Sequence, residues 1–209
     1  MQIAWLGQYT VKIATKDVVI VLDPYAPNVG LSPFRSKATI AGLTNPKDPS
    51  MSHLGGVIGQ ATIIDTPGEY SLSGTVLHSF GWQDNQGNER SIMRWIIEGM
   101  TLLHVGALDR KLTEAELADI NRTDIDILLV PVGGGTGLTT KGALDLVATV
   151  EPRMVIPIHF RLAGLTEKLE PVSQFAKEMG VSEKQAEKKI VLRPSRLPHE
   201  DMETVLLLP

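Results

Sequence analysis

The sequence predicts a mixed α/β fold in which two mixed β-sheets pack together and helices lie outside them. Two observations support this fold class. The first half of the 209-residue chain consists of short apolar runs separated by turn residues, whereas the second half alternates strand-like and helix-like segments. No segment has the composition of a linker, so we expect one domain that spans residues 1–209.

The strands of the first half are predicted from short aliphatic and β-branched runs, which fit a pleated and half-buried surface. Turn-forming residues such as Pro67-Gly68 separate these runs. The predicted strands cover residues 2–7, 11–15, 17–23, 37–43, 61–66, 74–80, 91–98 and 100–106.

The second half opens with a predicted helix in which Thr113 fits the N-cap and Glu116, three residues later, completes a capping box. Two continuous apolar runs predict buried strands, and a later amphipathic helix ends at Gly180. The predicted helices cover residues 112–120, 140–150 and 171–180, and the predicted strands cover residues 126–132, 153–160, 189–194 and 204–209.

Composition excludes several classes of protein. Apolar residues make up 43% of the chain and charged residues 21%, as in ordinary globular proteins. The net charge of −4 argues against binding of nucleic acid through a basic surface. No apolar run approaches the roughly 18 residues of a membrane span, and no signal peptide is apparent, so we expect a cytoplasmic protein, with a homo-oligomer permitted. The absence of cysteine excludes disulfides and thiolate metal sites.

Several segments together are similar in order and spacing to a known family. They are LLHVGALDRKLTEAEL (102–117), DILLVPVGGGTGLTTKGALDLV (126–147), EPRMVIPIHF (151–160), the early strand that ends in VLDPY, and PGEYSLSG. On these segments the chain resembles the metallo-β-lactamase-fold superfamily, and within it the small lactonase-like zinc-dependent hydrolases. The resemblance covers nearly the whole chain and implies a four-layer α/β/β/α sandwich.

The resemblance also implies metal-assisted hydrolysis, in which two zinc or similar ions at one edge of the sandwich activate a bridging water. The family's first ligand cluster is His-x-His-x-Asp-His on a loop after a strand. The corresponding loop of this chain reads TNPKDP (44–49), so only Asp48 matches. The three histidine positions hold Thr44, Pro46 and Pro49, and proline has no side-chain donor atom.

The other ligand positions implied by the resemblance are also altered. The bridging aspartate of the family's Gly-Asp pair is replaced by Ala107, and the family's Gly-His at the first turn reads Gly7-Gln8. Asp84 is the substitute in the loop where relatives tend to carry a further histidine. His159, at the end of the last buried core strand, fits the final ligand position.

A zinc ion needs three or four donors, and this resemblance leaves too few of them. We therefore expect a protein that has lost the two-metal site, needs no cofactor, and binds a small molecule or a protein partner without catalysis. The alternative is a metal-dependent hydrolase of lactones, phosphodiesters or related esters, with an altered, mononuclear zinc or manganese site. Its ligands would come from Asp48, His159, Asp84 and His53.

The remaining pocket is expected to contain a small hydrogen-bonded network in place of metals. In this network Asp48 would pair with Lys47, Arg161 or backbone N–H groups. The glycine-rich segment 133–140 opens a helix, where backbone N–H groups can bind an anion, although a flexible turn is the simpler interpretation. The residues expected to line the pocket are Gln8, Thr44, Trp82, Asp84, Ala107, Gly134, Thr136, His159 and Arg161.

Overall fold

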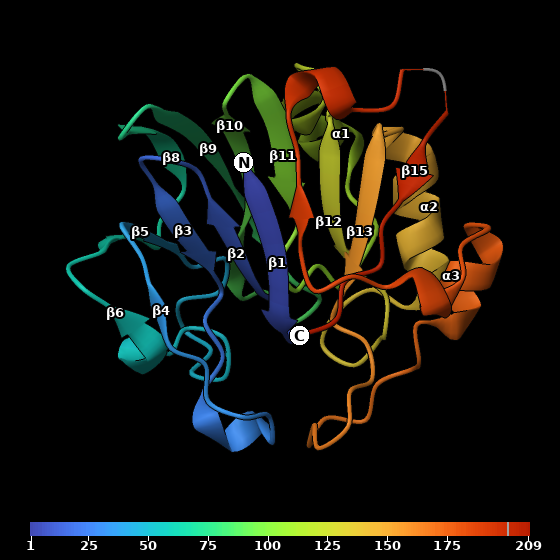
Figure 1. The fold of residues 1–209 in the computed structure, drawn as a ribbon, viewed down its shortest axis with the longest axis horizontal. Helices are drawn as coiled ribbons and strands as arrows, with labels where there is room; N and C mark the ends of the chain where they lie inside the picture. The colour runs from blue at the N-terminus through green and yellow to red at the C-terminus, as the bar shows by residue number, and fades with distance from the viewer. Residues whose placement is uncertain (200) are drawn as a thin grey trace.

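Two large β-sheets and a few short helices make up the fold in the computed structural model, which describes residues 1–199 and 201–209 (Figure 1). The predicted fold class, an α/β/β/α sandwich of two mixed sheets, is confirmed. The described part of the chain contains no helix that is long and apolar enough to cross a membrane.

The first sheet has six strands and is built mainly from the first third of the chain. Its antiparallel hairpin of β1 and β2 continues into β3, and β3, β5 and β7 then run parallel to one another. The carboxyl ends of these three parallel strands therefore meet at one edge of the sheet. In spatial order the strands are β14 (Ile190–Val191), β1 (Gln2–Gly7), β2 (Thr10–Ala14), β3 (Val19–Leu22), β5 (Ile40–Gly42) and β7 (Thr62–Ile64), and a separate pair is formed by β4 (Ser36–Lys37) and β6 (Val57–Ile58).

The second sheet has seven strands. Its antiparallel half is the meander of β8, β9, β10 and β11, and its parallel half joins β11 to β12, β13 and β15. In spatial order the strands are β15 (Glu203–Thr204), β13 (Met154–Ile158), β12 (Ile127–Pro131), β11 (Met100–His104), β10 (Glu89–Ile97), β9 (Thr75–Gln83) and β8 (Gly68–Leu72).

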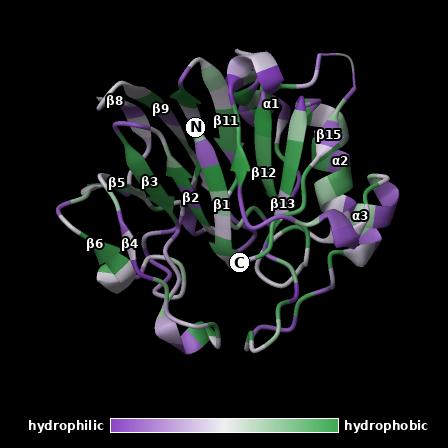
Figure 2. Cartoon of the chain, in the orientation of Figure 1, coloured by the Kyte–Doolittle hydropathy of each residue, from purple (hydrophilic) through white to green (hydrophobic). Residues whose placement is uncertain are grey.

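The core lies between the two sheets and under the helices. The strands β12 and β13 are buried at every residue, which explains their continuous apolar sequence (Figure 2). Trp5 of β1 and Trp95 of β10 are among the largest fully buried side chains. Burying an aromatic side chain of this size contributes several kcal/mol at about 25 cal/mol per Å² of apolar area.

The α-helices come from the second half of the chain, whereas the first half forms only the short 3₁₀ helices η1 (Pro27–Val29) and η2 (Leu54–Gly56). The longest helix, α2, packs on β12 and touches α3. The helices are α1 (Glu114–Ile120), α2 (Thr140–Val150) and α3 (Ser173–Glu178), with further 3₁₀ turns η3 (Glu183–Gln185) and η4 (Pro194–Arg196).

The predicted capping box of α1 is present. The Thr113 side chain accepts a hydrogen bond from the Glu116 backbone N–H, and the Glu116 carboxylate accepts one from the Thr113 backbone N–H at 2.7 Å. Arg110 also donates to both oxygens of Glu116, at 2.7 and 2.9 Å. These bonds, led by the one from Arg110, hold the pKa of Glu116 at about 2, below its ordinary 4.5.

Replacing Glu116 with Gln should lower the free energy of unfolding by about 1 kcal/mol at pH 7, because this pair is partly screened by solvent. A carboxylate whose pKa is depressed on folding stabilises the fold above its unfolded pKa, so the difference should shrink as the pH falls from about 4.5 towards about 2. Urea unfolding at pH 7, 4 and 3 measures the effect, with Glu114→Gln in the same first turn as the control. A difference that does not depend on pH would contradict this account of Glu116.

Three predicted strands are much shorter than expected. The 37–43 segment contributes only the short strands β4 and β5, and the 189–194 segment only β14. At the C-terminus, β15 pairs with β13 through Glu203 and Thr204. Leu206 and Leu207 instead pack in the core, Leu208 is exposed, and Leu207 forms one isolated bridge to Glu187. The apolar run at the C-terminus therefore predicts that these residues are buried, but it does not predict that they pair with a neighbouring strand.

Candidate functional site

The residues expected to line a pocket lie largely on loops at one edge of the sandwich. The loops that follow β3, β5, β11, β12 and β13 leave from the carboxyl ends of parallel strands, where ligands bind in open α/β sheets. The turn after β1 joins them, because the His159 backbone N–H donates to the Gln8 carbonyl at 3.2 Å. This edge lies along the bottom of Figure 1, where the yellow loop after β12 and the orange loop after β13 meet the turn that follows β1.

A first polar cluster is centred on Glu167, in the loop after β13. Its carboxylate lies 3.2 Å from His159 Nε2 and accepts hydrogen bonds from Thr136 through both the backbone N–H, at 3.1 Å, and the hydroxyl, at 3.2 Å. Gln8 Nε2 donates to the same carboxylate at 3.4 Å. Three residues expected in the pocket, Gln8, Thr136 and His159, therefore meet at Glu167.

His159 is the first residue after β13 and is fully buried. Its backbone has a φ of 49°, a left-handed conformation that is uncommon outside glycine and often marks a functional site. Its ring stacks on Tyr9 with the centroids 3.9 Å apart, and the Tyr9 hydroxyl lies 3.0 Å from Thr136 Oγ1. The stacking and the Glu167 contact together hold the imidazole in one orientation.

The electrostatics of this pair favour a neutral imidazole beside an ionised carboxylate. Burial lowers the pKa of His159, although the contact with Glu167 opposes that shift. For Glu167, burial alone would raise the pKa, but the bonds from His159, Thr136 and Gln8 prevail and lower it to about 2. Since 27% of the Glu167 side chain is exposed, its carboxylate can also meet solvent or a ligand.

The loop that carries Glu167 is held at both its base and its tip. At the base, Glu170 N–H donates to the Gly133 carbonyl and Arg161 N–H donates to the Glu170 carbonyl, each at 2.9 Å. At the tip, Thr166 N–H donates to the Val29 carbonyl at 2.9 Å. Arg161 therefore stabilises the base of this loop through a backbone hydrogen bond.

Gly30→Ala should detach the tip of this loop. Gly30 has a φ of 90°, and an added Cβ would lie 2.1 Å from the Gly164 carbonyl oxygen. Gly74→Ala is the matched control, because Gly74 also has a positive φ, 76°, but has nothing within 4 Å of its Cβ position. We expect Gly74→Ala to lower the unfolding free energy by about 1 kcal/mol and Gly30→Ala to lower it further. Hydrogen exchange of the Thr166 amide should accelerate only in Gly30→Ala, and equal exchange in both variants would contradict the docking.

A second, fully buried network joins the two sheets through Asp23, Thr44 and His104. Asp23 Oδ1 accepts from the Thr44 backbone N–H, and Asp23 Oδ2 accepts from the Thr44 hydroxyl, both at 2.7 Å. His104 Nε2 lies 2.7 Å from the same Oδ2. Thr44 thus lies in a hydrogen-bonded network, but it binds Asp23, which also binds His104, and Asp48 does not take part.

The neighbourhood of Thr44 is closely packed. A Cβ added to Gly106 would lie 2.2 Å from Thr44 Oγ1, so the loop that contains Gly106 and Ala107 runs directly against this network. Ala107 is itself buried, and its carbonyl accepts a hydrogen bond from Arg90 at 3.3 Å. Ala107 holds the position where the resemblance implies a bridging carboxylate, and here that position binds the Arg90 guanidinium through its backbone carbonyl.

A third group surrounds Asp84 at the turn between β9 and β10. Arg90 donates to Asp84 Oδ2 through Nε at 3.0 Å and through a terminal nitrogen at 2.7 Å, and Asn88 and the Gln86 backbone also donate to this carboxylate. Although burial alone would raise it, these hydrogen bonds hold the pKa of Asp84 well below its usual range. Trp82 is buried, and the Cζ atoms of Arg90 and Arg110 lie 5.9 and 5.0 Å from its ring centroid.

The other residues that the sequence singled out lie apart from these groups. Asp48 closes its own turn, accepting from the backbone and hydroxyl of Ser50 at 2.8 and 2.7 Å. His53 precedes η2 and lines a small cavity with Phe34 and Arg35. Gly134 has a φ of 72° and shapes the loop after β12.

These positions do not provide a conventional metal site. Among the described residues, no group of three or more His, Asp or Glu side chains is placed to hold a metal ion. His159 and Glu167 offer two donors, whereas zinc takes three or four. These side chains therefore do not fit the two-metal centre that the family resemblance of the sequence implies.

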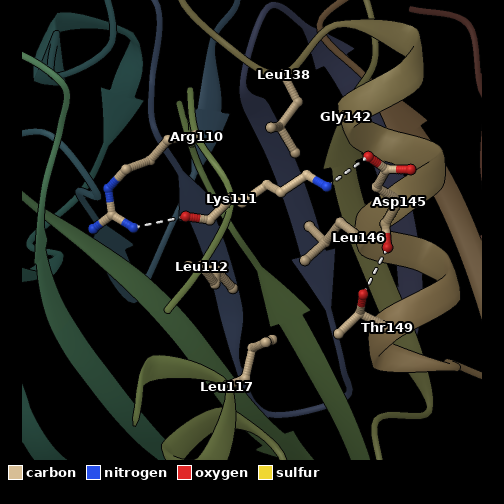
Figure 3. Close-up of a pocket in the computed structure, with 9 residues that line it drawn as sticks. All are labelled: Arg110, Lys111, Leu112, Leu117, Leu138, Gly142, Asp145, Leu146 and Thr149. Carbon is tan, nitrogen blue, oxygen red and sulfur yellow. Dashed lines mark hydrogen bonds and ion pairs between the residues drawn. The ribbon is translucent and has the colours of Figure 1, made fainter. Parts of the chain in front are cut away.

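Two cavities adjoin the third group, through Trp82 and Arg90 in one and Arg110 in the other. One, of about 510 Å³, is lined by side chains from the loop after β5, the segment after β7 and the strands β9 and β10, among them Lys47, Trp82 and Arg90. The other, of about 180 Å³, has a leucine-rich wall between the 110–117 segment and α2, and its Lys111 pairs with Asp145 at 3.2 Å (Figure 3). The second cavity shares only Arg110 with the third group, and its Lys111 is paired with Asp145, so we place the site at the Glu167 cluster and treat the first cavity as a separate feature of the same edge.

Sequence reasoning missed four residues that organise this edge: Tyr9, Asp23, Arg90 and Glu167. None lies in a recognisable ligand motif. Tyr9 and Asp23 have partners far along the chain, such as His104, which is 81 residues from Asp23, whereas Arg90 pairs with Asp84 six residues away. Glu167 could have been suspected from its position, because it is a carboxylate only eight residues after His159, in the loop that follows the same strand.

Comparison with known proteins gives a consistent result. The family model described as "Beta-lactamase superfamily domain" matches residues 2–159. A UPF0173 protein of Pyrococcus abyssi is 25% identical and is aligned over 78% of this chain and 85% of its own length. A UPF0173 metal-dependent hydrolase of Carboxydothermus hydrogenoformans is 30% identical over 70% of this chain and 67% of its own.

A solved structure from Thermotoga maritima, described as a candidate Zn-dependent hydrolase of the metallo-beta-lactamase superfamily, is similar over 99% of this chain and 98% of its own. Its TM-score is 0.78 and its sequence identity 25%. These names overturn the expectation of a non-catalytic protein and favour the alternative, a hydrolase. They also give no support to the expectation that no metal cofactor is needed.

Proposed function

Because the chain belongs to the beta-lactamase superfamily, we propose that it is a hydrolase of lactones, phosphodiesters or related esters, with an altered site at the Glu167 cluster. Relatives named as metal-dependent hydrolases support the reaction class. The single structural observation that carries the proposal is the convergence of Gln8, Thr136 and His159 on one partly exposed carboxylate. Such convergence of polar groups on one partly exposed carboxylate is typical of an active site.

Each side chain of the cluster has a role that follows from its bonds. Thr136 and Gln8 direct donors at Glu167 and keep it ionised. Glu167 can then accept a hydrogen bond from a water molecule and orient it towards a substrate. A pKa of about 2 makes this carboxylate a weak base, so orientation of the water is its main contribution.

His159 supports that role from the buried side. Its ring is held by stacking on Tyr9, and its Nε2 lies beside Glu167, so the position of the carboxylate depends on the imidazole. We assign no step to a metal, since the described residues do not form a three-donor group. The roles above belong to side chains that this chain carries.

The test is a panel of esters assayed with purified protein, with and without added zinc or manganese. We expect turnover of at least one lactone or phosphodiester above the rate without enzyme. His159→Ala should lower that rate by about 100-fold, with circular dichroism showing a retained fold. If the wild-type rate equals the rate without enzyme for every substrate, with and without metal, the hydrolase proposal fails.

A further inference from the structure

A third cavity, of about 510 Å³, borders the loop that carries Glu167, and we call it the Leu162 cavity. Four leucines from segments far apart in the sequence line it: Leu6 near the end of β1, Leu31 after η1, Leu162 after β13, and Leu208. In Figure 1 two of these segments, the blue one around η1 and the orange loop after β13, both lie at the bottom of the molecule.

The wall of the Leu162 cavity is apolar. Among the residues that the structure describes, none with a charged side chain lines it. The hydroxyl of the buried Tyr25 already donates to the Ser32 carbonyl at 2.6 Å. The four leucines are nevertheless incompletely buried, and Leu208 is 42% exposed. A hydrocarbon group would cover them, whereas a charged group would lose its water there without gaining a partner.

Two wall segments of this cavity are fixed by hydrogen bonds to distant parts of the chain. In the loop that contains Leu162, Thr166 N–H donates to the Val29 carbonyl at 2.9 Å. Leu208 N–H donates to the Glu187 carbonyl, also at 2.9 Å. A cavity with a preformed wall needs little ordering when a ligand binds, so more of the apolar contact appears as affinity.

The Leu162 cavity and the Glu167 cluster are built on the same two segments. In the turn after β1, a Cβ added to Gly7 would lie 2.5 Å from Leu31 Cδ1 and 3.6 Å from Leu162 Cδ1, so Gly7 packs against leucines of the cavity. The next residue, Gln8, donates to Glu167 at 3.4 Å. The loop after β13 carries both Leu162 and Glu167. The contacts of one turn and one loop therefore connect the cavity to the cluster.

We propose that the Leu162 cavity binds a hydrocarbon group, such as an alkyl chain, of a molecule whose polar end lies at the Glu167 cluster. The inference rests on the proposed hydrolase function and narrows its substrates to amphipathic molecules. A volume of about 510 Å³ falls within the usual range of ligand pockets, roughly 300–1,000 Å³. The hydrocarbon group is bound by burial alone, so its length sets the affinity.

Binding is measured without turnover, with the alcohols 1-butanol, 1-hexanol and 1-octanol as probes. Titration followed by NMR of ¹³C-labelled leucine methyl groups gives both the Kd and the place of binding. We expect the Kd to fall about fourfold for each added methylene, because each one is removed from water. The largest shifts should occur at Leu6, Leu31, Leu162 and Leu208.

Three variants test whether the alcohols bind in this cavity. Ala163→Trp fills the cavity from an exposed position, and Leu208→Gln makes its wall polar. Ile63→Gln is the matched control, because Ile63 on β7 is 47% exposed, close to the 42% of Leu208, but does not line the cavity. We expect Ala163→Trp to weaken binding of 1-hexanol about tenfold and Leu208→Gln about threefold, whereas Ile63→Gln should match wild type. All three positions are exposed, so circular dichroism should show a retained fold.

Turnover is measured separately with the 4-nitrophenyl esters of acetic, butyric and hexanoic acid. Dihydrocoumarin, a lactone without an alkyl chain, reports whether wild type hydrolyses esters at all. In wild type, kcat/KM should rise about tenfold from acetate to butyrate and again to hexanoate, since binding of the chain stabilises the transition state as well as the substrate. In Ala163→Trp this dependence on chain length should be lost.

The outcomes separate this inference from the proposed function. Binding of 1-hexanol that Ala163→Trp abolishes, without turnover of any ester by wild type, would support the cavity and remove the hydrolase proposal. Turnover of dihydrocoumarin without binding of the alcohols would overturn the inference and leave the hydrolase. Equal kcat/KM values for the three esters in wild type would separate the cavity from the active site and also overturn the inference.

Two further results would count against the Leu162 cavity as a ligand site. Equal effects of Leu208→Gln and Ile63→Gln on the Kd would mean that the alcohols bind elsewhere. A dimer in analytical ultracentrifugation that Leu208→Gln dissociates would mean that a second copy of the chain covers these leucines.

Discussion

Asp23→Ala is expected to lower the free energy of unfolding by about 3–5 kcal/mol, because it leaves three buried polar groups without their acceptor. The Thr44 backbone N–H, the Thr44 hydroxyl and His104 Nε2 each lie 2.7 Å from the Asp23 carboxylate, and all three residues are essentially inaccessible to solvent. The carboxylate joins the loops after β3 and β5 to the end of β11. Its removal should therefore weaken the contact between the two sheets.

Urea unfolding of three variants isolates this effect. Asp23→Asn keeps a side chain that tolerates the left-handed backbone at φ 42°, so it separates the lost hydrogen bonds from backbone strain. Asp48→Ala is the matched control, since that carboxylate bonds only within its own exposed turn and should cost less than about 1 kcal/mol. A cost for Asp23→Ala no larger than the cost for Asp48→Ala would contradict the structural role of the network.

Glu167→Gln is expected to lower kcat for ester hydrolysis by about 100-fold while KM changes little. The amide has one oxygen in place of two and adds donors, so it cannot accept from Thr136, Gln8 and His159 together. A water molecule at this position would then lose its fixed acceptor. Stability should change by less than about 1.5 kcal/mol, because the side chain is partly exposed.

The control for this variant is Glu178→Gln, which makes the same chemical change on an exposed position of α3. Initial rates on dihydrocoumarin and thermal unfolding are measured for both variants. Equal rates for Glu167→Gln and wild type would mean that the carboxylate is structural. A loss of rate that is accompanied by a large loss of stability would also mean that the Glu167 carboxylate is structural.

Much of the fold was predictable because the signals were local. The buried strands β12 and β13 are continuous apolar runs, and α1 begins at a capping box whose two halves are three residues apart. The predicted strand at 204–209 was mostly wrong, because Leu206 and Leu207 pack in the core while the ladder stops at Thr204. Burial and strand pairing share a sequence signal, and only the spatial neighbours separate them.

The site was predictable only in part, for a related physical reason. His159, Gln8 and Thr136 could be placed at one edge from the order of strands and loops. Glu167 could not, since its contact with His159 depends on a loop that docks against Val29 far away in the sequence. The network expected around Asp48 forms around Asp23, because Thr44 turns inward and Asp48 closes its own turn.

The central claim, that this edge of the sandwich hydrolyses esters through its own clustered side chains, is tested most directly by one comparison of rates. Wild type and the double variant His159→Ala/Glu167→Gln are assayed side by side on dihydrocoumarin, with equal folded protein verified by circular dichroism. The account predicts measurable turnover by wild type and a rate at least about 100-fold lower for the double variant. Equal rates for the two proteins would contradict it.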